Sequence, residues 1–209
     1  MSVLDKLACS LGRRDEVPNQ ELARDLVKSR DTAAIRVLVD NLWNTNKDIR
    51  FDCIKTLYEI GYQKPELITG HVAEFAKLIT DKENRMVWGG MLALTTVAAL
   101  NPGPIFQNLG LFQKVIQKGS VITVDGGVKA LALAASADEK YRSSILPWLL
   151  DFLATVRPKS VAQYAESILP AVDGAHKQEF IEILNRRLTD LSPSQTARVK
   201  KVIKVSETR

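Results

Sequence analysis

The chain has 209 residues, of which 45% are hydrophobic and 25% are charged, and its net charge is +5. These values exclude a fibrous or intrinsically disordered chain and predict a folded protein with a sizeable core. The two cysteines, Cys9 and Cys53, are too few for a disulfide framework or a four-cysteine metal site. We therefore expect reduced thiols, with Cys53 as a small core residue.

The first residues of the chain lack the charged and then apolar pattern of a secretory signal peptide. The longest strongly apolar run, 86–100, is too short to cross a bilayer comfortably, and it ends at the Asn-Pro-Gly-Pro of 101–104. These observations predict a buried helix over this run and a cytoplasmic protein without membrane contact.

The positive charge is confined to the C-terminal end of the chain. Residues 186–209 include seven basic and two acidic residues, which account for the whole net charge, so residues 1–185 are neutral. A nucleic-acid-binding domain needs a basic stripe on its folded surface. The neutral body therefore disfavours nucleic acid as a partner.

In chain order, the sequence predicts a helical cap, four helix pairs and a second cap within one domain. Apolar residues recur at three- and four-residue spacing nearly everywhere, and proline and glycine separate the segments. The N-terminal cap covers 1–30 and the C-terminal cap, with its basic tail, covers 178–209. The pairs cover 31–67, 68–104, 105–141 and 142–177.

A spacing of 37 residues defines the four pairs. Six apolar residues of the first pair each have an apolar equivalent 37, 74 and 111 residues later. All 24 positions of this register, six in each of four pairs, are therefore apolar. Such a register is typical of a repeat array, whose terminal units are irregular because they must cover an apolar face. The starting residues are Ile35, Leu38 and Leu42 in the first helix, called A, and Ile54, Leu57 and Ile60 in the second, called B.

The B helix of the first pair, over 46–60, places Asp48 and then Arg50 near its start, followed by small and aliphatic positions. In this pattern the chain resembles the HEAT-repeat family and its armadillo relatives, although the later pairs depart from it, with Arg85 and Val87 at the equivalent positions. The resemblance implies an all-α, right-handed α-solenoid with A helices on the convex face and B helices on the concave face. It implies no particular activity, because such repeats mostly serve as binding scaffolds.

Two adjacent glycines, Gly89 and Gly90, recur one repeat later as Gly126 and Gly127. Glycine inside a helix costs about 1 kcal/mol relative to alanine, so the repetition calls for a reason. We expect Gly90 and Gly127 to let neighbouring B helices approach closely. Gly89 and Gly126 are predicted to lie nearer the outward side, where they leave room for a ligand or peptide backbone.

The concave B face is the predicted site for a protein or peptide partner. Trp88 and Leu92 share a helix face, and Trp88 is either an exposed binding anchor or packed against the turn between repeats. We expect Trp43 and Trp148, on A helices, to serve packing. The candidate partner-binding residues are Phe51, Lys55, Trp88, Gly89, Leu92, Asp125 and Lys129.

The sequence contains no constellation that predicts catalysis, a metal site or a cofactor. His71 and His176 are isolated from other ligands, and no phosphate-binding loop or nucleophile elbow occurs. Carboxylate pairs such as Asp81/Glu83 and Asp138/Glu139 lie at turns and helix starts, where they favour the helix dipole. We therefore expect a non-catalytic protein without a cofactor.

The alternative is a nucleic-acid-binding protein, in particular an enzyme that resembles the HEAT-like DNA glycosylases for alkylated bases. Such an enzyme would need a catalytic aspartate with aromatic and basic side chains on the concave face. Asp125, Trp88, Lys55 and Lys129 are the available candidates. The neutral charge of residues 1–185 argues against this alternative.

A C-terminal helix is predicted from Ser192, which can form a capping box with Gln195, and Pro193 occupies the favoured first position. Its apolar stripe is Val199, Val202 and Ile203. The helix either caps the solenoid with a polar face that happens to be basic, or docks an acidic partner or nucleic acid. The basic residues of this tail are Arg198, Lys200, Lys201 and Lys204.

Overall fold

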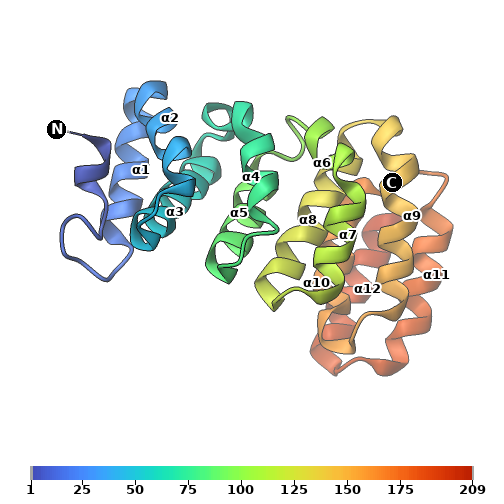
Figure 1. Cartoon of the computed structure of the whole chain (residues 1–209). Helices are drawn as coiled ribbons and strands as arrows, with labels where there is room; N and C mark the ends of the chain where they lie inside the picture. The colour runs from blue at the N-terminus through green and yellow to red at the C-terminus, as the bar shows by residue number, and fades with distance from the viewer. Residues whose placement is uncertain (1, 209) are drawn as a thin grey trace.

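The computed structural model describes residues 2–208, over which the chain forms twelve α-helices, six short 3-10 helices and no strand (Figure 1). The predicted all-α class is therefore confirmed. The α-helices are α1 (Val17–Ser29), α2 (Thr32–Asp40), α3 (Lys47–Gln63), α4 (Val72–Leu78), α5 (Asn84–Val97), α6 (Gly103–Gln107), α7 (Leu109–Lys118), α8 (Val121–Ala137), α9 (Glu139–Thr155), α10 (Pro158–Ile168), α11 (Lys177–Arg187) and α12 (Pro193–Glu207). The 3-10 helices are η1 (Val3–Lys6), η2 (Asn41–Trp43), η3 (Pro65–Leu67), η4 (Thr69–His71), η5 (Leu169–Ala171) and η6 (Leu188–Asp190).

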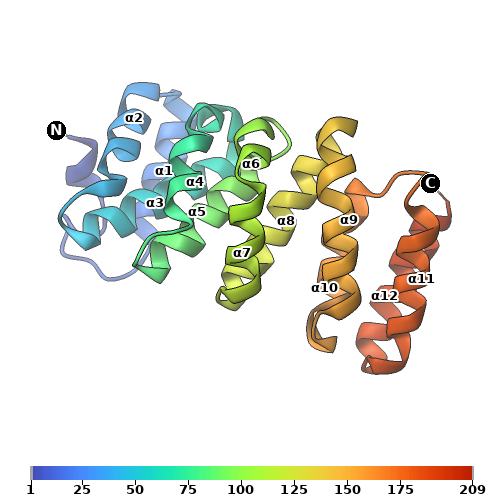
Figure 2. The same ribbon diagram turned by 45° about the vertical axis from the view of Figure 1, so that its right-hand side comes forward.

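The longer helices form two rows that run along the molecule (Figures 1 and 2). In the first, the B row, α1, α3, α5, α8, α10 and α12 each pack against the next. The second, the A row, contains α2, α4, α7, α9 and α11, and each of these packs against the B helix that follows it. Because the helix pairs contact their neighbours along the rows, the molecule is an α-solenoid.

The 37-residue register predicted the core of this solenoid. Of its 24 positions, 23 are buried with at most 2% of their surface exposed, and the remaining residue, Leu109, is partly buried. Burial of one large aliphatic side chain contributes about 1.5–3 kcal/mol, so these positions dominate the stability of the fold. Among the helices over residues 2–208, none combines the length and the apolar character that a bilayer crossing requires.

The two ends continue the B row beyond the register. At the N-terminus, α1 packs against α3, and at the C-terminus α11 and α12 form a fifth pair against α9 and α10. In this pair Ile183 and Val202 keep the 37-residue spacing and are buried, whereas exposed Arg186 and Asp190 replace two apolar A-helix positions. A capping role for this pair, and the division of the chain into caps and repeats, remain predictions.

Short polar side chains start several helices by binding free backbone N–H groups. Asn46 accepts from the N–H of Asp48 at α3, and Asp138 accepts from the N–H of Lys140 at α9. The predicted capping box of Ser192 and Gln195 begins α12, with Pro193 in its first turn. These caps fix where α3, α9 and α12 begin relative to the helix before each of them.

Arg50 links the first repeat to the second. Its guanidinium donates to the carbonyl of Leu42 at 2.8 Å and pairs with Asp81, which also accepts the N–H of Glu83 at 2.9 Å. The predicted capping carboxylate Asp81 thus binds both the backbone before α5 and an arginine of α3. Glu83 itself makes no side-chain cap and pairs with Lys47.

The glycine pairs occupy two different contacts, and the predicted assignment was wrong for Gly89 and Gly126. Both are buried, and a Cβ at Gly89 would lie 2.9 Å from Ile54 of α3. A Cβ at Gly126 would lie 3.1 Å from Met91 of α5, which is the 37-residue equivalent of Ile54. The first glycine of each pair therefore lets neighbouring B helices approach each other, and it leaves no room for a ligand.

The second glycine of each pair faces the A helix of its own repeat. A Cβ at Gly90 would lie 2.8 Å from Leu78 of α4, and one at Gly127 would lie 2.6 Å from Ile116 of α7. The prediction that these glycines serve packing is confirmed, but the neighbour is the A helix and not the adjacent B helix.

The tryptophans on the A side differ in environment. Trp148 stacks on Phe152 with ring centroids 5.3 Å apart, so its packing role is confirmed. Trp43 is 47% exposed, and its predicted packing role was wrong. The reason is local, because the 3-10 turn η2 directs the preceding Leu42 into the core and leaves Trp43 in solvent.

We predict that Gly89→Ala lowers the free energy of unfolding by about 1–3 kcal/mol, because its methyl group would overlap the branched side chain of Ile54. Urea unfolding followed by circular dichroism measures the change. The matched control is Gly110→Ala in α7, where no atom lies within 4 Å of the added Cβ and alanine should stabilise the helix by up to about 1 kcal/mol. Equal effects of the two substitutions would contradict the packing role of Gly89.

Candidate binding face

The candidate site is the side of the B row that faces away from the A row, here called the B face. Steps of 37 residues place Lys55, Leu92, Lys129 and Glu166 at one position of four successive B helices. A second such set is Phe51, Trp88 and Asp125. The structure therefore gives these predicted residues equivalent places on the repeats, but it gives them different surroundings.

Lys55, a predicted partner-binding residue of the concave B face, is buried, with only 6% of its surface exposed. Its ammonium lies 2.8 Å from a carboxylate oxygen of Glu16 and 2.7 Å from one of Glu59. Burial lowers the pKa of Lys55, but the hydrogen bonds that its ammonium donates to Glu16 and Glu59 outweigh burial and hold the pKa above its ordinary value. The two acids compensate the buried charge, which is therefore not free to meet a partner.

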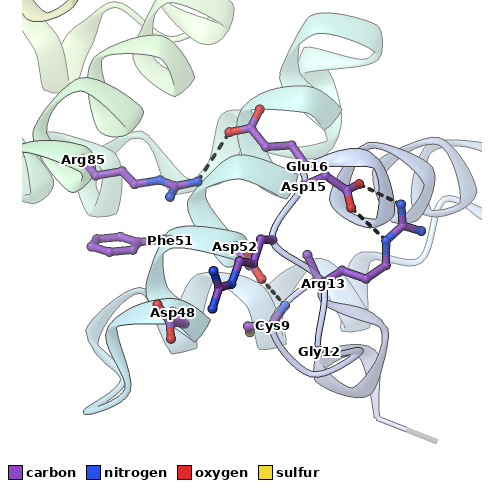
Figure 3. A pocket seen from close by; sticks show the side chains of 11 residues that line it. Cys9, Gly12, Arg13, Asp15, Glu16, Asp48, Phe51, Asp52 and Arg85 are labelled. Carbon is purple, nitrogen blue, oxygen red and sulfur yellow. Dashed lines mark hydrogen bonds and ion pairs between the residues drawn. The ribbon is translucent and has the colours of Figure 1, made fainter.

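Glu16, at the start of α1, connects this end of the chain to α3 and α5. Besides binding Lys55 of α3, it lies 3.4 Å from the guanidinium of Arg85 in α5. Arg85 in turn lies over the ring of Phe51, 5.1 Å from its centroid. Glu16, Arg85 and Phe51 thus form one contact chain across the start of the B face (Figure 3).

A cavity of about 440 Å³ lies beside this contact chain, between the loop 7–16 and the first turns of α3 and α5 (Figure 3). Asp52 fastens the loop to α3, because its carboxylate accepts the N–H of Cys9 at 2.7 Å and the side-chain amide of Asn19 at 2.8 Å. Burial, followed by the nearby Asp52, raises the pKa of Cys9 to about 11. The cavity is lined by Ala8, Cys9, Gly12, Arg13, Arg14, Asp15, Glu16, Asp48, Phe51, Asp52 and Arg85.

Aromatic side chains gather next to the cavity. Trp88 is half-buried and lies 6.3 Å from the ring of Tyr58, which is 5.8 Å from the exposed Tyr62. The ammonium of Lys55 lies 4.8 Å from the centroid of Tyr58. Together with partly buried Leu92, Trp88 forms an apolar surface that is supported by the core and still reaches solvent.

The two predicted partner-binding residues of α8, Asp125 and Lys129, lie in different environments. Asp125 accepts a hydrogen bond from the hydroxyl of Tyr164 at 2.9 Å, which ties α8 to α10. Burial, followed by this hydrogen bond to Asp125, raises the pKa of Tyr164 to about 12. Lys129 is exposed, and over the described residues 2–208 its ammonium has no ion-pair partner.

The basic tail is a packed helix with one residue tied to the repeat before it. Arg198 forms two hydrogen bonds with Glu166 of α10, at 2.9 and 2.7 Å, and this contact holds the pKa of Glu166 below its ordinary value. Val199, Val202 and Ile203 are buried as predicted. Lys200, Lys201 and Lys204 are exposed, and none of the three has an ion-pair partner within the part of the chain that the structure describes.

The predicted isolated histidines lie away from the B-face residues. His71 ends η4, and burial lowers its pKa. The Nδ1 atom of His176 lies 2.7 Å from Asp173, whose pKa is lowered by this hydrogen bond. No group of three or more histidine, cysteine, aspartate or glutamate side chains that could hold a metal occurs within residues 2–208.

Sequence patterns did not identify several of the residues that shape the site. Tyr58 lies three residues after Lys55, so helical spacing could have placed it on the same face. Arg85 is the 37-residue equivalent of Asp48, so the repeat register could have placed it at the start of the second B helix. No sequence pattern pointed to a role for Glu16 in the site, because Glu16 lies before the 37-residue register begins.

No known family model matches this sequence, and no curated protein matches it. Solved structures do match. An engineered protein from the Northeast Structural Genomics Consortium is 20% identical with a TM-score of 0.67, over 100% of this chain and 98% of that chain. A designed armadillo repeat protein in complex with the peptide (KR)4 is 16% identical with a TM-score of 0.69, over 90% of this chain and 85% of that chain.

A third match is a structure of computationally designed armadillo repeat proteins for modular peptide recognition. It is 14% identical with a TM-score of 0.64, and the match covers 97% of both chains. The likeness at these identities concerns the fold. The predicted resemblance to HEAT and armadillo repeats is confirmed, and the chain has the fold of an armadillo- and HEAT-like α-solenoid.

We predict that Glu16→Ala destabilises the protein by about 1–3 kcal/mol, because it removes one of the two carboxylates that compensate buried Lys55 and the ion-pair partner of Arg85. Chemical unfolding measures the loss. Glu21→Ala on α1 is the control, since Glu21 is exposed and lies 4.0 Å from exposed Arg24, where an ion pair contributes at most about 1 kcal/mol. A Glu16→Ala protein as stable as the control would rule out the linking role of Glu16.

Proposed function

We propose that this armadillo- and HEAT-like solenoid is a non-catalytic binding scaffold whose B face docks an extended segment of a partner protein. Within the proposal the protein acts in the cytoplasm and needs no cofactor. The observation that carries the proposal is Trp88, half-buried on the B face between Tyr58 and the partly buried Leu92. A tryptophan held by core contacts and still open to solvent is a frequent energetic anchor in protein interfaces.

The solenoid fold supports this proposal by its shape. A row of B helices presents equivalent positions at regular intervals, and an extended peptide can contact several of them in turn. Two structural neighbours are described as a designed armadillo repeat protein in complex with the peptide (KR)4 and as designs for modular peptide recognition. We extend peptide recognition to this chain as part of the proposal.

The state of the reactive side chains also favours binding over catalysis. Asp125, which a glycosylase-like mechanism would need, accepts a hydrogen bond from Tyr164. Lys55, which would face DNA phosphates, is buried between Glu16 and Glu59. Burial and the neighbouring Asp52 raise the pKa of Cys53, and a thiol with a raised pKa is a poor nucleophile.

We predict that Trp88→Ala weakens binding of a B-face peptide by tenfold or more, in line with the loss of about 2 kcal/mol that removal of an interface anchor typically causes. The peptide is obtained by selecting a random decapeptide display library on the immobilised full chain, and fluorescence anisotropy measures its affinity.

The matched control is Trp43→Ala, which also removes a tryptophan but from the exposed turn between α2 and α3. Its affinity should stay within twofold of the original chain. Circular dichroism of both variants checks that the helices are retained. A peptide whose affinity falls equally in both variants, or in neither, would refute the B face as the docking surface.

The nucleic-acid alternative makes a separate prediction. We expect a 20-base-pair duplex DNA to bind no more tightly than about 100 μM at physiological salt, a strength at the weak end of nonspecific protein–DNA binding. Anisotropy titrations over a salt series measure this. Submicromolar binding whose logarithm falls steeply with salt, and which Lys129→Glu abolishes, would favour the nucleic-acid function instead.

A further inference from the structure

The partner segment can be characterised further from the charges of the B face, and this inference rests on the proposed function. We infer that the docked segment places an apolar or aromatic side chain against α3 and α5 and acidic side chains against α8, α10 and α12. The first half of the B face offers aromatic surface with neutralised charges, whereas the second half offers free cations.

In the first half, each basic residue of α3 and α5 already has a carboxylate. Lys55 is buried between Glu16 and Glu59, and Arg85 lies against Glu16 and over the ring of Phe51. An acidic side chain of a partner would therefore be repelled by the carboxylates that already pair with these cations. What this half leaves open to a partner is the surface of Trp88 and Leu92.

In the second half, three exposed lysines stand on consecutive B helices. They are Lys129 on α8, Lys159 on α10 and Lys201 on α12. Lys159 lies two helical turns before Glu166, the 37-residue equivalent of Lys129, and Lys201 acts on the carboxyl of the same Glu166, so both belong to the B face. None of the three ammonium groups has an ion-pair partner within residues 2–208. Lys201 is near enough to Glu166 to lower the pKa of that carboxyl, although the hydrogen bonds from Arg198 have the larger effect.

The acids of α8 and α10, Asp125 and Glu166, are occupied by contacts within the protein. Asp125 accepts from Tyr164 at 2.9 Å, and Glu166 binds Arg198 through both carboxylate oxygens. The carboxylates that could neutralise the lysines are thus held in place by other donors. A partner approaching α8, α10 and α12 meets three exposed positive charges, which acidic side chains complement.

The helix spacing fixes the expected pattern of the segment. Packed helices lie about 8–10 Å apart, and an extended chain advances about 3.3 Å per residue, so neighbouring B helices are roughly three residues apart along the segment. An apolar anchor over α5 is then followed by acidic residues at intervals of about three, as the segment crosses α8, α10 and α12. This pattern is the opposite in charge to the peptide (KR)4 that one designed structural neighbour holds.

A protein segment fits these charges better than a nucleic acid. Nucleic-acid phosphates repeat along the whole strand, so they would also lie against Asp125, Glu166 and the carboxylates around Lys55. A peptide can alternate apolar and acidic residues and match both halves. Long-range attraction by the lysines would increase the rate at which such a segment associates.

The test is selection of a random decapeptide display library on the full chain and on a variant with Lys129→Glu, Lys159→Glu and Lys201→Glu. The matched control carries Lys77→Glu, Lys82→Glu and Lys114→Glu, which change the net charge equally at exposed lysines of the A row and its turns. We expect selected peptides to be enriched in aspartate and glutamate at spacings of about three, next to an aromatic or aliphatic residue. The first triple variant should lose this enrichment and bind a selected peptide at least tenfold more weakly, whereas the control should bind it within twofold.

The outcomes separate this inference from the proposed function. Selected peptides without acidic bias, or with lysine and arginine enriched, that still lose affinity in Trp88→Ala would overturn the acidic partner and leave the docking face intact. Absence of any enrichment over an empty support would overturn both. Equal loss of affinity in the two triple variants would show that net charge alone attracts the peptide, and it would also overturn the inference.

Discussion

Close approach between neighbouring B helices is the constraint on which the rest of the structure depends. At Gly89 the backbone of α5 touches the branched side chain of Ile54 in α3, and at Gly126 the backbone of α8 touches Met91 in α5. A Cβ at Gly89 would overlap Ile54, and a Cβ at Gly126 would crowd Met91 less severely. Because Ile54 and Met91 are equivalent residues one repeat apart, the same contact sets the spacing of three successive B helices.

This spacing also determines what the B face can do. The second glycine of each pair, Gly90 or Gly127, brings the A helix of the same repeat equally close. Both rows are therefore held by backbone-to-side-chain contacts, which adjust less than contacts between two flexible side chains. A face built on such contacts keeps Trp88, Asp125 and Lys129 at fixed intervals, and under the proposed function a partner segment of matching spacing would bind without reorganising the solenoid.

The sequence predicted the core well because hydrophobic periodicity is a property of each repeat. Leu57 and its equivalents Leu94 and Leu131 are buried at the same position of three repeats, so an apolar residue recurs there every 37 residues. The site was harder to predict. Gly89 was assigned to the outer side because helical spacing alone does not tell which neighbour a small residue touches. Trp43 was assigned to packing because the 3-10 turn that ends its helix early leaves no clear mark in the sequence.

The largest departure from the sequence prediction, at Lys55, has one cause inside the first repeat and one outside the repeats. Lys55 and Lys129 are equivalent residues, yet the first is buried and paired and the second is exposed and free. Part of the difference comes from Glu59, four residues after Lys55, because Leu133 stands at the same place after Lys129. The rest comes from Glu16, just before α1, which binds Lys55 of α3 and belongs to no repeat of the register. The segment before α1 therefore contributes to the charge of the first half of the B face, and the repeats determine its spacing. A solenoid of similar units can in this way present an apolar half and a cationic half, and so distinguish the two ends of a bound segment.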